Sequence, residues 1–364
     1  MKKIHVVSSA ALLCAFCLMV FGVRMAHSQG KIPPGVNPVR MVITDQAYND
    51  GGEVPVLKSE DLQVKVGDEN AKIVELTPAQ GNLAALQLFI LIDDACEPHE
   101  IGNNLSDLRE FINAQPASTM VGIAYMSNAT IQVAQNLTND HGLAANALRL
   151  PRGSAAAKDS PYLSLISLVR AWPDQSARRQ VLMVTDGIDR LRGDTSRFGP
   201  GPTPVPAGLS FPPASAATPP SRRPLPPSTP PPRSVGVAVT PTIPVDANTA
   251  SELSQQNGII VHSIYSPGVG RLGRNAWEAQ LGQSGIAMIT DETGGEYFAL
   301  GTQKAVSFKP FLERLQKIFS NQYFLVLHVP AGKQARLQRV RISSEVPNAD
   351  IAAANNVWVP AAGS

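Results

Sequence analysis

Acidic residues stand directly after two apolar stretches of the sequence, and carboxylates in that position are well placed to bind a ligand. Residues Leu86–Ile92 are apolar at six of seven positions, which predicts a strand buried on both faces, and Asp93 and Asp94 follow it. Val181–Val184 repeats this design and leads, after one threonine, into Asp186. Open α/β sheets bind their ligands at the carboxyl ends of the strands. We therefore expect Asp93 and Asp186 to meet at one edge of a parallel sheet.

The segments that would position these carboxylates alternate between strand and helix patterns. Apolar strands are expected over residues 121–126 and 258–264, and helices over residues 105–112, 286–293 and 308–319. A further helix is expected to begin after Ser160, because serine caps a helix and Pro161 suits its first position. This alternation predicts βαβ units and a parallel sheet.

The two flanks of this region alternate apolar and polar residues, which is typical of strands with one solvent-exposed face. Residues 36–80 and 323–360 are expected to form a small β-sandwich-like domain beside an α/β domain at residues 84–322. The predicted fold class is therefore α/β, with a doubly wound, mostly parallel sheet of Rossmann-like type and a small antiparallel β domain built from the N- and C-terminal flanks.

Residues 199–244 interrupt the α/β pattern with 16 of the 31 prolines of the chain. Such a segment has too few large apolar side chains to offset the entropy of ordering it, so we predict a proline-rich, disordered insertion within the α/β domain. One interpretation is a loop or spacer. The other is a docking motif around Arg222 and Arg223 that fits an aromatic groove.

The N-terminus has the composition of an export signal. Lys2 and Lys3 precede an apolar core, and small residues lead up to Ser28. We predict a signal peptide over residues 1–28 and an exported protein that is secreted, periplasmic or part of the cell envelope. An uncleaved membrane anchor is the alternative, because the apolar run is roughly long enough to span a bilayer.

The charge of the chain bears on its possible partners, and its cysteine content bears on possible disulfides. The predicted signal carries three of the 31 basic residues and none of the 29 acidic ones, so the remainder has a formal charge of −1 and does not indicate a nucleic-acid partner. Two of the three cysteines also lie in the signal, which leaves Cys96 without an intramolecular disulfide partner. Cys96 and His99 have a spacing that a transition metal can use, but two ligands do not make a site and a packed free thiol is commoner.

The order of these motifs resembles a von Willebrand factor type A domain. In that order, a strand ending in Asp is followed by a helix, a strand, a helix opened by Ser or Thr, and a strand ending in Thr-Asp-Gly. Residues 182–187, LMVTDG, are closely similar to the second acidic strand end of the family. The segments at residues 39–64 and 291–327 are similar to a bacterial group of exported proteins related to this family. The resemblance covers nearly all of residues 38–345 and implies a doubly wound sheet.

The resemblance also implies a metal-ion-dependent adhesion site. Such a site binds Mg²⁺ or Mn²⁺ and leaves one coordination position for an acidic group of a protein partner. Asp93 matches the first aspartate of the Asp-x-Ser-x-Ser motif, Asp186 matches the last aspartate, and Ser160 stands where a threonine is expected. Ala95 and Glu97 replace the two serines. Glu97 can supply an oxygen, although it adds a negative charge and a longer side chain.

We therefore predict a degenerate adhesion site. Its candidate metal ligands, for Mg²⁺ or Mn²⁺, are Asp93, Glu97, Ser160 and Asp186. Its candidate partner-binding residues are Asp93, Asp94, Ser160 and Asp186. The alternative is a polar sheet edge that binds no ion.

The function expected from these observations is that of an exported, non-catalytic protein-interaction module of adhesion type. No catalytic residues are predicted, because the sequence contains no Gly-x-Ser-x-Gly, His-Glu-x-x-His or phosphate-loop motif. One alternative is a structural envelope or surface component that uses the proline-rich insertion. Another is a secreted metal-assisted hydrolase with His99 as the base. Contact with a membrane is expected only if the N-terminal segment stays uncleaved.

Overall fold

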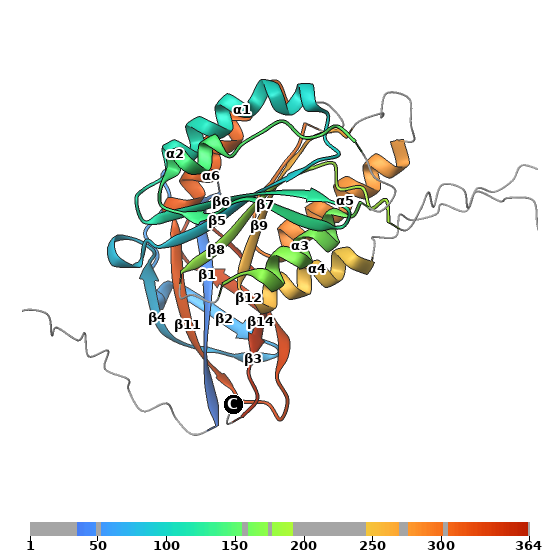
Figure 1. Cartoon of the computed structure of the whole chain (residues 1–364). Helices are drawn as coiled ribbons and strands as arrows, with labels where there is room; N and C mark the ends of the chain where they lie inside the picture. The colour runs from blue at the N-terminus through green and yellow to red at the C-terminus, as the bar shows by residue number, and fades with distance from the viewer. Residues whose placement is uncertain are drawn as a thin grey trace, which may run out of the picture.

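A six-stranded sheet forms the centre of the protein, in a computed structural model that describes residues 35–48, 52–154, 159–173, 177–191, 245–268, 276–300 and 305–362 (Figure 1). The strand order is β10-β9-β8-β5-β6-β7, and every neighbouring pair is parallel except β6 and β7. The strands are β5 (Leu86–Asp93), β6 (Thr119–Ser127), β7 (Thr130–Thr138), β8 (Arg178–Thr185), β9 (Ile259–Tyr265) and β10 (Tyr297–Phe298). The predicted signal peptide and the proline-rich insertion lie outside the described residues.

Helices cover both faces of this sheet (Figure 1). One face carries α1 (Pro98–Asn113), α2 (His141–Asn146) and α6 (Lys309–Ser320), and the other carries α3 (Pro161–Ala171), α4 (Val245–Gln256) and α5 (Ala276–Glu292). Along β5, Leu88 and Ile90 pack into the first core, whereas Phe89 and Leu91 pack into the second. The strand is therefore buried on both faces, as its apolar sequence predicts.

The helix expected over residues 286–293 is longer in the structure, because α5 already begins at Ala276. Gly282 and Gly285 interrupt its apolar pattern, and the packing explains both. A Cβ atom at Gly282 would lie 2.5 Å from the carbonyl oxygen of Asp186, and one at Gly285 would lie 2.1 Å from the hydroxyl oxygen of Tyr162. Gly282 thus lets α5 approach the turn after β8, which is the turn that carries Asp186, and Gly285 lets α5 approach Tyr162 of α3.

The N- and C-terminal flanks pair with each other in two antiparallel sheets below the α/β domain (Figure 1). The first sheet has the order β13-β1-β11-β4, with β1 (Val36–Ala47), β4 (Lys72–Pro78), β11 (Gln322–Pro330) and β13 (Ala349–Ala353). The second has the order β14-β12-β2-β3, with β2 (Leu62–Val66), β3 (Glu69–Asn70), β12 (Arg336–Ser344) and β14 (Asn356–Val359). Both sheets contribute to one apolar core. The predicted fold class is thus confirmed, including the β domain made from both ends of the chain.

Arg178, the first residue of β8, ties the two domains together from the inside. Its side chain is buried, and its guanidinium donates hydrogen bonds to the carbonyl oxygens of Phe319 and Ala84, both at 2.8 Å, and to the side-chain oxygen of Gln322 at 2.7 Å. Gln322 belongs to β11 of the β domain. Burial lowers the pKa of Arg178 to about 10, so the side chain is still charged at neutral pH.

A line of buried polar side chains continues from Gln322 into the α/β domain. Gln180 donates to the side-chain oxygen of Gln322 at 2.6 Å, and Nε2 of His262 lies 2.8 Å from Oε1 of Gln180. The backbone N–H of Glu296 donates to Nδ1 of His262 at 3.0 Å, so the proton of the neutral imidazole must be on Nε2. At the other end, Gln322 donates to the hydroxyl of Thr44 in β1 at 3.2 Å.

The described helices contain no segment that is both long enough and apolar enough to cross a membrane. The predicted export signal and the alternative of an N-terminal anchor both concern residues outside the described ranges.

Candidate functional site

The carboxyl ends of β5 and β8 bring Asp93 and Asp186 together. The two strands pair in parallel up to Ile92 and Val184, so the residues that follow leave the sheet side by side. We call the region formed by Asp93, Asp94, Asp186 and Arg190 the mouth. All three of its carboxylates are buried. Buried carboxylates need hydrogen bonds or an opposite charge, so the partners of each one define what the mouth can do.

Both oxygens of Asp93 accept hydrogen bonds from the protein. Oδ1 accepts from the backbone N–H of Ala95 at 2.9 Å, and Oδ2 accepts from the hydroxyl of Thr185 at 2.7 Å. Burial, reinforced by the nearby charge of Asp186, raises the pKa of Asp93 to about 7. The two hydrogen bonds hold the carboxyl group in one orientation.

Asp186 forms an ion pair with Arg190, four residues further along the chain. Oδ2 of Asp186 lies 2.5 Å from Nη2 of Arg190, and Oδ1 accepts from the backbone N–H of Ile188 at 2.8 Å. The backbone N–H of Arg190 in turn donates to the carbonyl oxygen of Asp159 at 2.8 Å. Arg190 is thus held both at its backbone and at its guanidinium, which stands directly against the buried carboxylate.

Asp94 turns away from this pair and organises the loop after α2. Its carboxylate accepts two hydrogen bonds from the guanidinium of Arg149, at 2.7 and 2.9 Å, and one from the backbone N–H of Arg152 at 3.2 Å. Its backbone carbonyl accepts from the N–H of Gly153 at 3.0 Å. The guanidinium of Arg149 also lies over the ring of Tyr125, 3.6 Å from its centroid. The loop over residues 149–153 is therefore rigidly attached to the mouth.

The remaining predicted site residues have other partners. The hydroxyl of Ser160 caps α3 by accepting from the N–H of Leu163 at 3.4 Å, and Glu97 occupies the N-cap position of α1. Cys96 is buried, and burial, with the charges of Asp93 and Asp186, raises the pKa of its thiol. His99 instead contacts Asn103 on the same helix, with 3.3 Å between the side-chain nitrogens.

These positions do not fit a divalent ion held by the predicted ligand set. The guanidinium of Arg190 already occupies one carboxylate oxygen of Asp186, and the hydroxyl of Ser160 caps α3. Within the part of the chain that is described, no three His, Cys, Asp or Glu side chains are grouped so as to hold a metal. Mg²⁺ or Mn²⁺ binding by the four predicted ligands stays a prediction, and it requires Arg190 to move away.

Sequence reasoning missed three residues that shape this region: Arg149, Asp159 and Arg190. Arg149 and Arg190 stand in irregular segments, where no helical or strand periodicity marks a partner. Asp159 is buried just before the predicted cap Ser160, and its side chain accepts from the backbone N–H of Asn128 at 2.6 Å. In the sequence, the one local signal was an acidic residue directly before the Ser160-Pro161 pair.

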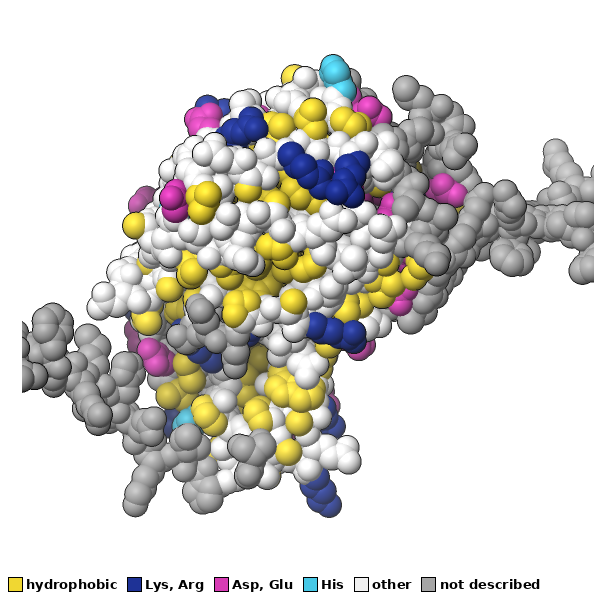
Figure 2. All heavy atoms as spheres, viewed as in Figure 1, with side chains coloured by type: hydrophobic (Ala, Val, Ile, Leu, Met, Phe, Trp, Pro, Cys, Tyr) yellow, Lys and Arg dark blue, Asp and Glu magenta, His cyan; other side chains and the backbone are white. Residues whose placement is uncertain are grey.

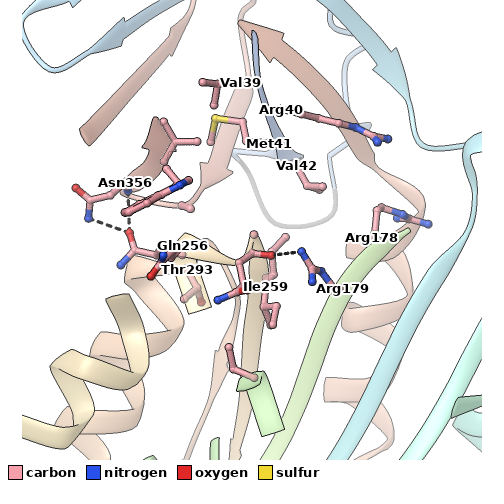
Figure 3. Close-up of a pocket in the computed structure, with 18 of the residues that line it drawn as sticks. Val39, Arg40, Met41, Val42, Arg178, Arg179, Gln256, Ile259, Thr293 and Asn356 are labelled. Carbon is pink, nitrogen blue, oxygen red and sulfur yellow. Dashed lines mark hydrogen bonds between the residues drawn. The ribbon is translucent and has the colours of Figure 1, made fainter. Parts of the chain in front are cut away.

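A separate groove of about 640 Å³ lies at the other end of the parallel strands, between the two domains (Figure 3). β1 contributes Arg40 and Met41, and the starts of β8 and β9 contribute Arg179 and Ile259. Arg179 points across it and donates to the carbonyl oxygen of Asn257 at 2.5 Å. None of the sequence-predicted site residues lines this groove.

No model of a known protein family matches the sequence, and no curated protein matches it either. Similar solved structures include the conserved hypothetical protein BatB from Bacteroides thetaiotaomicron, with 12% identity and a TM-score of 0.37 over 64% of this chain and 98% of that one. A von Willebrand factor type A protein from Catenulispora acidiphila has 11% identity and a TM-score of 0.38 over 91% and 75% of the two chains. An aerotolerance-related membrane protein from Bacteroides fragilis has 10% identity and a TM-score of 0.34 over 65% and 98%. The likeness is one of fold.

Proposed function

We propose that this chain, whose α/β domain has the von Willebrand factor type A fold, is an exported, non-catalytic protein-interaction module. The observation that carries the proposal is an exposed ridge that the buried mouth holds in place. We call Arg149, Leu150 and Arg152 the arginine ridge. The side chains of Arg149 and Arg152 are 36% and 56% exposed, and Leu150 is 49% exposed.

The arginine ridge has the properties of a protein-binding surface. Asp94 fixes Arg149 and the backbone of Arg152, so little conformational entropy is lost when a partner binds. Arginine is enriched at the energetic centres of protein interfaces, and an exposed leucine between two arginines supplies apolar area. Figure 2 shows basic and hydrophobic side chains next to each other on the side of the molecule where α1 and α2 lie. A partner with an apolar pocket rimmed by carboxylates fits this chemistry.

The predicted partner-binding residues have an indirect role in this proposal. Asp93, Asp94, Ser160 and Asp186 are all buried, so a partner reaches the ridge first. Asp94 then acts by positioning the ridge, and Asp93 and Asp186 act by fixing the strand ends from which Asp94 extends. Direct contact with Asp186 would require Arg190 to leave it.

The chemistry of the mouth favours binding over catalysis. The thiol of Cys96 is buried and its pKa is raised by that burial, so it is a poor nucleophile. His99, the base of the alternative hydrolase, contacts Asn103. Export itself is proposed from the N-terminal sequence, with its Lys2, Lys3 and apolar core.

Replacing Leu150 with aspartate is expected to weaken partner binding. Charging an anchor of this kind costs on the order of 2 kcal/mol or more, about thirtyfold in Kd. The wild type and the variant are immobilised and exposed to the envelope and secreted proteins of the source cell. Proteins retained by the wild type should be lost from Leu150→Asp.

Leu143→Asp is the matched control, because Leu143 is also 49% exposed but belongs to α2 and is not one of the three residues of the ridge. It should retain the same proteins as the wild type, and both variants should unfold within about 0.5 kcal/mol of it. Equal retention by all three proteins would rule out the ridge as the binding surface.

A further inference from the structure

We propose that the guanidinium of Arg190 takes the place of a divalent ion in the mouth, so that this site is complete without a metal. A metal ion in such a site compensates the charge of carboxylates at the strand ends. Here the compensating charge is a side chain of the protein itself. The proposal concerns the mouth alone and does not depend on the identity of a partner.

The contacts of the carboxylates leave no oxygen without a protein donor. Asp93 accepts from the N–H of Ala95 and the hydroxyl of Thr185, and Asp186 accepts from the N–H of Ile188 and from Nη2 of Arg190. Mg²⁺ requires oxygen ligands at about 2.0–2.1 Å in octahedral array. An ion bound to Oδ2 of Asp186 in the direction that Nη2 of Arg190 now occupies, 2.5 Å away, would collide with that nitrogen.

The chain also closes over the ion pair. A Cβ atom on Gly268 would lie 2.1 Å from Oδ2 of Asp186 and 3.0 Å from Nη2 of Arg190, so only glycine fits at this position. Gly268 is held there by a bridge to Cys96, and the backbone N–H of Glu97 donates to the carbonyl oxygen of Pro267 at 3.0 Å. The pair is therefore built into the packing of the loop after β9.

Charge balance supports the same assignment. Asp93, Asp159 and Asp186 are all buried and all act on the guanidinium of Arg190, which supplies the positive charge in their midst. Burying like charges together without compensation is strongly unfavourable. An arginine serves this purpose well, because its guanidinium keeps its charge when buried and is more weakly hydrated than an ammonium ion.

Removing Arg190 is expected to create a metal site that the wild type lacks. The full chain is titrated with MnCl₂ by calorimetry as wild type, Arg190→Ala, Arg190→Lys and the double variant Arg190→Ala/Asp186→Asn. The wild type should bind no Mn²⁺ at millimolar concentration, and neither Mn²⁺ nor EDTA should change its Tm. Arg190→Ala should have a lower Tm than the wild type, and this Tm should rise with Mn²⁺ concentration.

The other two variants identify the cause. Arg190→Lys keeps a cation and should show no response to Mn²⁺, and the double variant should lose the response because it lacks the Asp186 carboxylate. The single variant Asp186→Asn is titrated beside the wild type. Binding of Mn²⁺ to the wild type that Asp186→Asn abolishes would overturn the proposal, and this comparison is decisive even if Arg190→Ala does not fold. A folded Arg190→Ala variant whose Tm does not change with Mn²⁺ concentration would also overturn the proposal. In that case a metal ion cannot bind at the position that the guanidinium has left.

Discussion

Arg178→Ala is expected to lower the free energy of unfolding by about 3 kcal/mol or more. The substitution leaves the carbonyl oxygens of Ala84 and Phe319 and the side-chain oxygen of Gln322 without their buried donor, and an unsatisfied buried polar group costs about 1–3 kcal/mol. Relief from burying a charge, which is evident in the lowered pKa of Arg178, offsets part of this loss. Urea unfolding followed by circular dichroism and tryptophan fluorescence measures the change.

Arg179→Ala is the control for this prediction. Arg179 is the next residue of β8, it is only partly buried, and its guanidinium donates to the carbonyl oxygen of Asn257. Its removal should cost about 1 kcal/mol, the usual contribution of one hydrogen bond. Equal urea midpoints for the two variants would show that Arg178 does not hold the α/β and β domains together.

His262→Gln is expected to remove a large part of the acid sensitivity of the protein. Burial lowers the pKa of His262 from 6.5 to about 3, because the imidazole is enclosed between Gln180 and the N–H of Glu296 and has no solvent to stabilise its charge. Between these two pH values the unfolded chain binds a proton that the folded chain does not. The contribution of His262 to stability is therefore present above about pH 6.5 and declines by about 1.4 kcal/mol for each pH unit below it.

The contribution of His262 is measured as the difference in the free energy of unfolding between the wild type and His262→Gln at each pH. Burial raises the pKa of both Asp45 and Asp93 to about 7, so these two carboxyl groups oppose His262 and favour the folded state as pH falls. Urea unfolding at pH 7, 6, 5 and 4 should show that the free-energy gap between wild type and His262→Gln narrows steadily towards low pH. His141→Gln, which removes an imidazole at the start of α2, is the control. A gap that stays constant over this range would mean that His262 is not buried in its neutral form.

A polar line from Thr44 through Gln322 and Gln180 to His262 gives these two predictions a common basis. Each link is a hydrogen bond between buried side chains of different strands, so loss of one member leaves its neighbours unsatisfied. Such a network fixes one relative placement of the β domain and the α/β domain. The mouth lies at the far end of β8, the strand to which Gln180 belongs, so the mouth and the arginine ridge that Asp94 attaches to it are carried on a rigid support.

Local sequence patterns were sufficient for most of the fold. The run Leu86–Ile92 indicates a strand buried on both faces, and the Ser160-Pro161 pair indicates the start of α3. The failure at α5 has a physical cause: Gly282 and Gly285 weaken a helical pattern, yet they are needed where the helix touches the turn after β8 and Tyr162 of α3. In the sequence alone, such a glycine is interpreted as a helix-breaking residue, because the neighbour that requires it is distant in the chain.

The amino-acid sequence was sufficient to predict that two aspartates would meet at one edge of a parallel sheet, because strand periodicity and the order of elements can be read locally along the chain. The structure shows in addition that their strands, β5 and β8, are neighbours. Only the tertiary structure decided what compensates them. Arg190 reaches Asp186 through an irregular turn, Asp159 anchors its backbone, and Gly268 closes over the pair from the loop after β9. These contacts join residues that are up to 82 positions apart in the chain, from Asp186 to Gly268, and no periodicity of the sequence encodes them. The choice between a metal ion and a guanidinium is therefore made by packing.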